Sequence, residues 1–183
     1  MTKNHSNHAR KSTSLLIRDL PADLAKPLGR LMVAVYSSLD GFPSPDEQPD
    51  YYRMLANIGD FTRQSETRIL VALTPDHKLL GGVLYFGDMK DYGSGGTAPE
   101  VKNASGIRLL AVDAVARGMG VGKALTDACI RLAREKGHAQ VVLHTTKAMQ
   151  IAWRMYENIG FQRSLELDFS QQKLPVFGFR LDL

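Results

Sequence analysis

The chain of 183 residues carries a formal net charge of +4; 44% of its residues are hydrophobic and 23% are charged. These ordinary values favour one globular domain with enough chain for a hydrophobic core. No apolar run is long enough to span a membrane, and the single cysteine, Cys129, excludes an internal disulfide bond and a cysteine-based zinc site. We therefore expect a cytoplasmic protein that works without a metal.

The N-terminus is basic, because four lysine and arginine residues precede the first acidic residue, Asp19. Residues 1–12 are mostly polar, which predicts a disordered basic tail ahead of a single domain at residues 13–183. No aromatic residues are interleaved with basic ones in the manner of an RNA-binding sheet, so nucleic acid is not an expected partner.

Hydrophobic spacing in the first half of the chain predicts two helices and three strands. The pattern places strands at 14–18, 68–73 and 79–86 and helices at 23–39 and 50–58. Three prolines and a glycine mark the segment between the helices, 40–49, as a loop. The second and third strands are expected to form a hairpin.

The second half begins with a long connection at 87–106, and loops of this length are usually functional or mobile. After it the pattern predicts strands at 107–112, 140–145, 161–169 and 176–183 and helices at 121–136 and 148–159. Gly137 and Gly160 are expected to end the two helices. The strand–helix–strand order makes the central strands parallel, and the hairpins make the sheet mixed. This is one α/β domain with six or seven strands.

Three glycines at alternate positions, Gly118, Gly120 and Gly122, lie between a predicted strand and a predicted helix. Glycine is used where the backbone needs a positive φ or a close approach. Free N–H groups at a helix N-terminus bind anions, most often phosphate. Arg117 and Lys123 add positive charge beside the loop, which predicts a phosphate site.

The exact spacing separates this loop from two other phosphate loops. Arg117 and Ala124 break the Walker pattern, and Lys123 and Leu125 break the dinucleotide pattern. The remaining motif, Arg-x-x-Gly-x-Gly over residues 117–122, resembles the acyl-CoA pyrophosphate loop of the GNAT superfamily of N-acetyltransferases. The plain structural alternative is that the glycines only allow the helix to pack closely on the sheet.

A second motif at residues 152–161 reads Ala-x-x-Met-Tyr-Glu-x-x-Gly-Phe. It resembles the other GNAT hallmark, A-x-x-[LM]-Y-E-x-x-G-F, and follows the glycine-loop helix by one strand, as in that family. The resemblance covers residues 66–165. Met149 stands where family members often carry Asn, so one polar contact to the cofactor is expected to be missing or supplied elsewhere.

The resemblance implies the GNAT fold, a mixed and mostly antiparallel twisted sheet of six to seven strands flanked by about four helices. It also implies that acetyl-CoA lies where the central strand splays from its neighbour, and that Tyr156 is the general acid that protonates the departing thiolate. Without the resemblance, Tyr156 is a half-buried helix aromatic. The implied cofactor-binding residues are Leu110, Ala111, Val112, Arg117, Gly118, Met119, Gly120, Val121, Gly122 and Lys123.

An amine attacks a thioester only when it is neutral, so a base or a water relay is needed. The candidate bases are Glu100, Asp113 and His144, and the sequence does not separate them. Each also has a plainer interpretation: Asp113 as turn chemistry, His144 as a core histidine and Glu100 as a solvated side chain.

The predicted acceptor site is the segment 41–52, where Asp50 is an acid that attracts a cationic amine and Tyr51 and Tyr52 flank it. Together with the connection 87–106, this segment is expected to line the acceptor pocket. An equally plain interpretation is a polar loop followed by a helix start.

The sequence therefore predicts an N-acetyltransferase that moves the acetyl group of acetyl-CoA to an amine of a small molecule or a peptide. The alternatives are an enzyme with another acyl-CoA, a non-catalytic acyl-CoA-binding regulatory domain, and a nucleotide-phosphate binder, which the failed loop patterns disfavour. A homodimer is compatible with the sequence.

Overall fold

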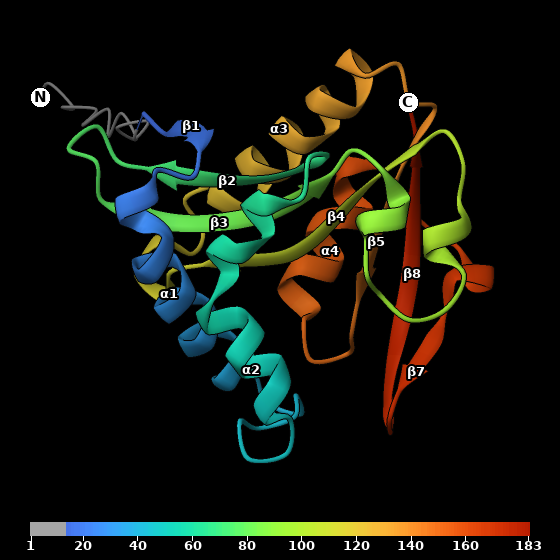
Figure 1. Ribbon diagram of the computed structural model, residues 1–183, viewed down its shortest axis with the longest axis horizontal. Coiled ribbons are helices and arrows are strands. Elements are labelled where there is room, and N and C mark those ends of the chain that lie inside the picture. The colour runs from blue at the N-terminus through green and yellow to red at the C-terminus, as the bar shows by residue number, and fades with distance from the viewer. Residues whose placement is uncertain (1–13) are drawn as a thin grey trace, which may run out of the picture.

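The computed structural model describes residues 14–183, so the tail predicted at 1–12 lies outside the described residues (Figure 1). The strands are β1 (Leu16–Asp19), β2 (Thr67–Leu73), β3 (Leu79–Phe86), β4 (Ala104–Val112), β5 (Gln140–Thr145), β6 (Gln162–Arg163), β7 (Phe169–Gln171) and β8 (Leu174–Asp182). The α-helices are α1 (Ala25–Ser37), α2 (Pro49–Ala56), α3 (Val121–Glu135) and α4 (Gln150–Ile159). None of the helices within 14–183 has the length and apolarity needed to cross a bilayer.

The strands form one sheet in the order β1-β2-β3-β4-β5-β8-β6, and β7 pairs with β8 beside it. Only β4 and β5 run parallel, because α3 carries the chain across between them; every other pair is antiparallel. The predicted mixed, mostly antiparallel sheet with about four helices is therefore confirmed. The strand count exceeds six to seven because β6 and β7 are only 2 and 3 residues long.

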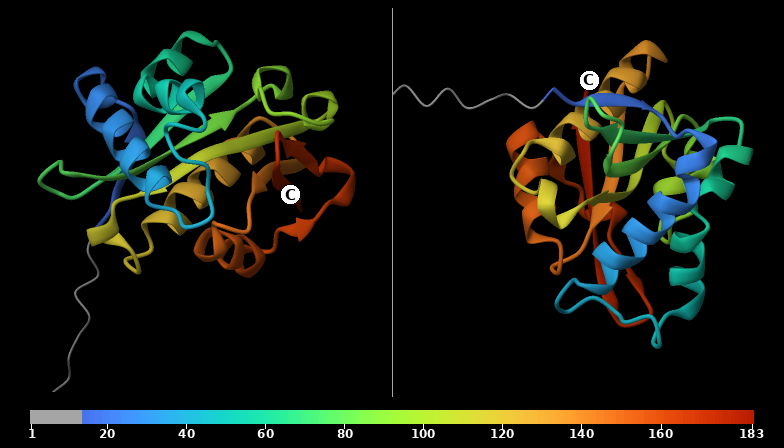
Figure 2. Two further views of the ribbon diagram at one scale, coloured as in Figure 1. Left: turned by 90° about the horizontal axis from the view of Figure 1, so that it is seen from below. Right: turned by 90° about the vertical axis from the view of Figure 1, so that its left-hand side faces the viewer.

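The alternation of side chains along the central strands gives the sheet two apolar faces. In β2, Ile69 and Val71 face α1 and α2, whereas Leu70 and Ala72 face α3. Figure 2 shows α1 and α2 on one side of the sheet and α3 and α4 on the other. The two helix layers therefore bury separate cores, and any site that uses both layers has to pass through a gap in the sheet.

That gap begins in the middle of β4. On one side β4 pairs with β5 over only four positions, from Ala104↔Gln140 to Ile107↔Leu143. On the other side the register with β3 shifts between Gly82↔Ala111 and Leu84↔Arg108, so that two residues of β4 oppose one of β3. The extra residue is a β-bulge at Leu109, whose φ is +55°. Beyond the bulge β4 separates from β5.

The predicted strand 161–169 is wrong in its middle. The chain leaves the sheet after β6, makes a 3₁₀ turn at Leu165–Leu167 and returns as β7. Arg163 and Asp168 form a two-point ion pair across this turn, at 3.0 and 2.7 Å, which favours the turn over an extended chain. Leu165, within this turn, is 74% exposed.

Other boundaries also differ from the prediction. Helix 50–58 ends at Ala56, and a 3₁₀ helix, Ile58–Arg63, follows it. The connection 87–106 is shorter and more ordered than expected, because it contains 3₁₀ helices at Met89–Asp91 and Ala98–Glu100 and joins β4 at Ala104.

Candidate active site

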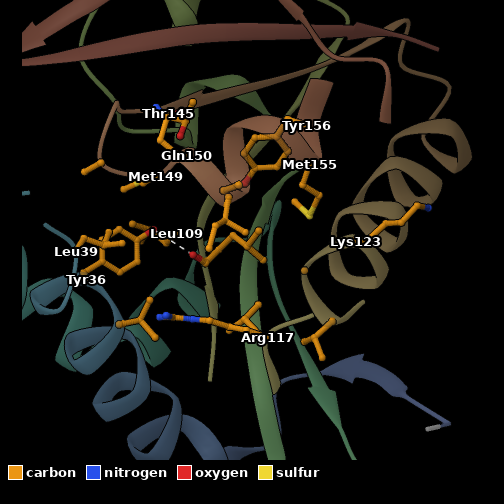
Figure 3. Close-up of a pocket in the computed structure, with 18 of the residues that line it drawn as sticks. Tyr36, Leu39, Leu109, Arg117, Lys123, Thr145, Met149, Gln150, Met155 and Tyr156 are labelled. Carbon is orange, nitrogen blue, oxygen red and sulfur yellow. Dashed lines mark hydrogen bonds between the residues drawn. The ribbon is translucent and has the colours of Figure 1, made fainter. Parts of the chain in front are cut away.

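A cavity of about 540 Å³ lies in the gap where β4 and β5 separate, and its walls are mostly apolar (Figure 3). It is lined from four directions: the C-terminal end of α1, the bulged part of β4, the glycine loop with the start of α3, and the end of β5 with α4. Figure 3 shows Tyr36 and Leu39 on one side of the cavity and Lys123 on the other. Because α1 and α3 cover opposite faces of the sheet, the cavity connects both faces.

The glycine loop ends in the N-terminus of α3, as its sequence predicts. Gly118 and Gly120 have φ of +75° and +80°, values that favour glycine. Gly120 is the N-cap and has no side chain to accept from the first N–H groups of α3, which therefore stay free for a ligand. Gly122 serves close packing, since a Cβ there would lie 3.2 Å from Met155 Sδ of α4. The loop thus forms a small anion cradle between α3 and α4.

The two cations beside this cradle differ in their partners. Lys123 Nζ lies 2.6 Å from an Asp127 carboxylate oxygen one turn further along α3. Arg117 is exposed and forms no ion pair within residues 14–183. The positively charged N-terminus of α3 and the side chain of Arg117 are therefore the groups available to attract an anion here.

The edge of β4 that faces the gap offers backbone groups without a strand partner. Its pairing with β5 stops at Ile107, so residues 109–112 have lost that neighbour. Tyr36, from α1, donates a hydrogen bond of 3.4 Å from its hydroxyl to the carbonyl of Leu110. An extended ligand with amide groups fits along this edge, in the place of the missing strand.

Tyr156 lies in the wall that α4 contributes, and only 5% of it is exposed. No partner for its hydroxyl is found among the described residues, and Figure 3 shows the hydroxyl directed into the cavity. Burial raises the pKa of Tyr156 above the ordinary value for tyrosine. Its phenol is therefore protonated at neutral pH and has a hydrogen to donate to a ligand.

His144, on β5, lines the cavity, but both of its ring nitrogens are engaged. Nε2 lies 2.8 Å from the carbonyl of Leu167, which only accepts, so Nε2 carries the proton. Nδ1 then accepts from the hydroxyl of Tyr92 at 2.9 Å. Burial lowers the pKa of His144, which favours this neutral tautomer. His144 is thus a fixed part of the wall.

The other predicted bases lie apart from the cavity. Asp113 follows β4 and accepts from the N–H of Val115 at 3.0 Å, so its carboxylate caps a 3₁₀ turn. Glu100 is an exposed residue of a 3₁₀ helix within the connection 87–106, and no residue of that connection lines the cavity.

The predicted acceptor residues do not line the cavity either. Asp50 is exposed and pairs with Arg53 at 2.5 Å. The ring of Tyr51 packs against those of Tyr36 and Phe42, with centroids 6.0 and 5.8 Å apart, and supports the wall from behind. Tyr52 donates from its hydroxyl to the carbonyl of Pro43 at 2.8 Å. Segment 41–52 therefore stabilises α1 rather than facing a ligand.

The cavity-lining residues that sequence reasoning missed include Tyr36, Arg108 and, as a site residue, Thr145. The hydroxyl of Thr145 is buried and has no hydrogen-bond partner among residues 14–183, which is unusual for an interior polar group. Two sequence features could have indicated site residues: Tyr36 stands near the end of an amphipathic helix, and Arg108 is a lone arginine inside an apolar strand. Within residues 14–183, no three His, Cys, Asp or Glu side chains gather as a metal-binding group, and the expected absence of a metal stays a prediction.

Comparisons with known proteins agree with this architecture. The sequence model of the acetyltransferase (GNAT) family matches residues 32–161. A probable N-acetyltransferase family 8 member 5 from Mus musculus is 42% identical over 55 residues, which are 30% of this chain and only 24% of that relative. The chain thus matches about a quarter of that curated relative's length.

Two solved structures share the fold over nearly their whole length. A GNAT-family acetyltransferase from Staphylococcus aureus Mu50 superposes with a TM-score of 0.70 at 20% identity, covering 93% of this chain and 99% of that one. The PaiA N-acetyltransferase from Thermoplasma acidophilum, solved in complex with coenzyme A, gives 0.69 at 14% identity, covering 90% and 98%.

Proposed function

The chain belongs to the GNAT acetyltransferase family, and on that premise we propose that it transfers an acyl group, acetyl first of all, from coenzyme A to an amine. The observation that carries the proposal is a single cavity that joins the N-terminus of α3, the unpaired edge of β4 and the hydroxyl of Tyr156. We call the loop 117–123 with the start of α3 the cofactor end of the cavity. The acceptor end is the part formed by the end of α1, Arg108 and His144.

The residues of the cofactor end fit coenzyme A. The free N–H groups at the start of α3 suit its pyrophosphate, since the helix dipole and Arg117 both attract negative charge. The amide groups of the pantetheine arm suit the backbone of residues 109–112, which has no pairing with β5. With the thioester carried along this edge towards the bulge, the reacting carbonyl lies between the two ends of the cavity.

The role proposed for Tyr156 follows from its protonation state. When a neutral amine attacks the thioester carbonyl, a C–N bond forms and the C–S bond breaks, so the sulfur departs with an electron pair. Tyr156 donates its hydrogen bond, and then its proton, to that sulfur, and recovers a proton from solvent. Burial raises the pKa of Tyr156, so the phenol holds its proton firmly. The hydrogen bond to the developing thiolate therefore lowers the barrier before the proton itself is transferred.

The attacking nitrogen must also lose a proton, and none of the three predicted bases has a free acceptor atom in the cavity. Both nitrogens of His144 are engaged, Asp113 caps a turn, and Glu100 lies outside the lining. We propose that solvent takes this proton. The rate should then increase with pH as more of the acceptor amine becomes neutral.

The proposal is tested by thiol release from acetyl-CoA in the presence of amino acids, short peptides, polyamines and aminoglycosides. The Tyr156→Phe variant should lower kcat about 100-fold on the preferred amine while the Kd for CoA changes little. The matched control is Tyr52→Phe, which removes a hydroxyl bonded to Pro43 outside the cavity and should leave kcat unchanged.

Equal kcat in the wild type and in Tyr156→Phe would contradict the acid role. Tight CoA binding without thiol release from any amine would contradict acetyl transfer, and the same panel with propionyl-CoA and succinyl-CoA would then separate another acyl group from a domain that only binds.

A further inference from the structure

Arg108 is a charged residue of β4, next to the bulge, and it lines the acceptor end of the cavity. Ile107 points to the core under α3, and regular alternation would put Arg108 on the α1 side and Leu109 back under α3. The extra residue instead leaves Arg108 and Leu109 on the same side, where both line the cavity. The bulge therefore adds Leu109 beside Arg108, whose guanidinium is a cation in a mostly apolar wall.

The contacts of Arg108 leave most of its hydrogen-bonding capacity unused. Nη1 donates to the carbonyl of Tyr92 at 2.5 Å, and the guanidinium lies 5.5 Å from the centre of the Tyr92 ring. A guanidinium has five N–H donors. Within residues 14–183, no carboxylate forms an ion pair with Arg108 and no second acceptor receives a hydrogen bond from it.

The groups around Arg108 are neutral at physiological pH. Tyr36 and Tyr92 are buried phenols with raised pKa values, and the partly buried His144 has a lowered pKa, so none of the three supplies a counter-charge. A partly buried cation without a counter-ion is costly, and a bidentate carboxylate is the partner that its planar fork fits best. The uncompensated charge therefore indicates an anion supplied by a ligand.

The charge balance of the cavity points the same way. Its lining holds three basic residues and one acidic residue, Asp40, which is exposed at the end of α1. Arg117 and Lys123 belong to the cofactor end, which follows the end of β4 at Val112. Arg108 lies four residues before Val112, and four strand residues span roughly 13 Å at about 3.3 Å per residue. A pyrophosphate bound by the loop therefore does not neutralise Arg108, and a polycationic amine is unfavourable in the acceptor end.

We propose that Arg108 binds the carboxylate of the acceptor, so that the acceptor is an amino acid or a close derivative with its carboxylate a few bonds from the reacting amine. This inference rests on the proposed function, because Arg108 is adjacent to the bulge where the thioester is expected. Val35, Leu39 and Met149 are apolar residues of the same cavity lining, and they favour an apolar side chain on that amino acid. Arg108 is a binding residue that sets specificity and takes no part in proton transfer.

The test compares leucine with leucinamide as acceptors for acetyl-CoA, since the two share a shape and differ in the carboxylate. The wild type should show a kcat/KM at least about 10-fold higher for leucine, the range expected when a charge-assisted hydrogen bond is lost. The amine of the amide is less basic and more often neutral, so this preference cannot come from amine availability. In Arg108→Gln the ratio should fall towards one, and Arg108→Lys should restore part of it.

Arg63→Gln is the matched control, because Arg63 is an exposed arginine that pairs with Asp60 outside the cavity, and the variant should keep the wild-type ratio. A readout without turnover is the affinity of the CoA-loaded protein for N-acetylleucine against N-acetylleucinamide. The first should bind at least about 10-fold more tightly, and only while Arg108 is present.

Three results would overturn the inference while the proposed function stands. They are equal kcat/KM for leucine and leucinamide in the wild type, a leucine preference that persists in Arg108→Gln, and an Arg108-dependent preference for succinyl-CoA with leucinamide. The last result would mean that Arg108 binds a carboxylate of the acyl group and not one of the acceptor. Thiol release from no acyl-CoA with any amine would instead contradict the proposed function, and the inference would fall with it.

Discussion

The two ends of the cavity are built from different parts of the chain. The cofactor end comes from one continuous segment, and its attraction for a ligand lies in backbone N–H groups and a helix dipole. The acceptor end is assembled from side chains on α1, β4 and β5, residues that lie 36 to 108 positions apart in the sequence. Backbone geometry should therefore decide affinity at the first end, and side-chain charge and hydrogen bonding should decide specificity at the second.

The strongest test of this comparison is a substitution at Gly120, where we expect the largest effect on CoA binding. In Gly120→Val, a β-branched residue is forced to a φ of +80°, at a cost of about 1–2 kcal/mol, unless the loop moves. We expect the loop to move and the Kd for CoA, measured by calorimetry, to rise at least about 10-fold.

Gly137→Val is the control for this prediction, because Gly137 lies just beyond the C-terminal end of the same helix with a φ of +73° and similarly open surroundings. It should lower the melting temperature comparably and leave the Kd for CoA unchanged. If both variants weaken CoA binding equally, strain in α3 rather than the loop backbone is responsible.

A smaller effect is expected from pH at the acceptor end. Because the pKa of His144 is lowered in the folded protein, the unfolded chain binds the proton first as pH falls. The stabilisation is therefore complete above the unfolded pKa of about 6.5 and is lost as pH falls from there towards the folded pKa. A single group contributes a slope of at most about 1.4 kcal/mol per pH unit.

Chemical denaturation between pH 7.5 and 5.5 measures this slope. His144→Asn should reduce the slope of the unfolding free energy against pH. The contribution of His138 is measured separately with His138→Asn, because burial also lowers the pKa of His138. If His144→Asn leaves the slope as it is in the wild type, the neutral tautomer inferred for His144 is wrong.

The smallest effect is expected from a side chain at the cofactor end. Arg117 is exposed, so Arg117→Gln should raise the Kd for CoA less than about 3-fold at 0.15 M salt, in line with an exposed ion pair. The loss should grow at low ionic strength, where screening is weaker. A 10-fold loss at 0.15 M salt would show that this end, too, depends on a side chain.

The same contrast explains how much the sequence predicts. The segment from β4 to α3 and the helix α4 are local patterns of strand, glycine loop and amphipathic helix, so their positions agree closely with the prediction. The roles given to the loop residues and to Tyr156 stay proposals. Tyr36 and Arg108 could not be assigned from sequence, because they line one cavity only through packing between distant segments.

Two misplaced features have physical reasons that no local pattern contains. The alternating residues 161–169 suit a strand, but the Arg163–Asp168 pair and the close approach of Gly178 to Leu167 favour a turn. The acidic and aromatic residues around 50–52 suit a binding loop, yet their rings pack behind α1. In both places tertiary contacts decide between two locally acceptable structures.

The bulge at Leu109 has a consequence at the level of the gene. The registers on its two sides differ by one residue, so a chain without Leu109 would keep Arg108 on the α1 side and Leu110 under α3, now in unbroken alternation. Nothing else in β4 would have to change faces. The bulge thus corresponds to one residue, and so to one codon, in an otherwise regular strand. Deleting that codon would remove the bulge and leave the order of side chains on both faces of β4 unchanged.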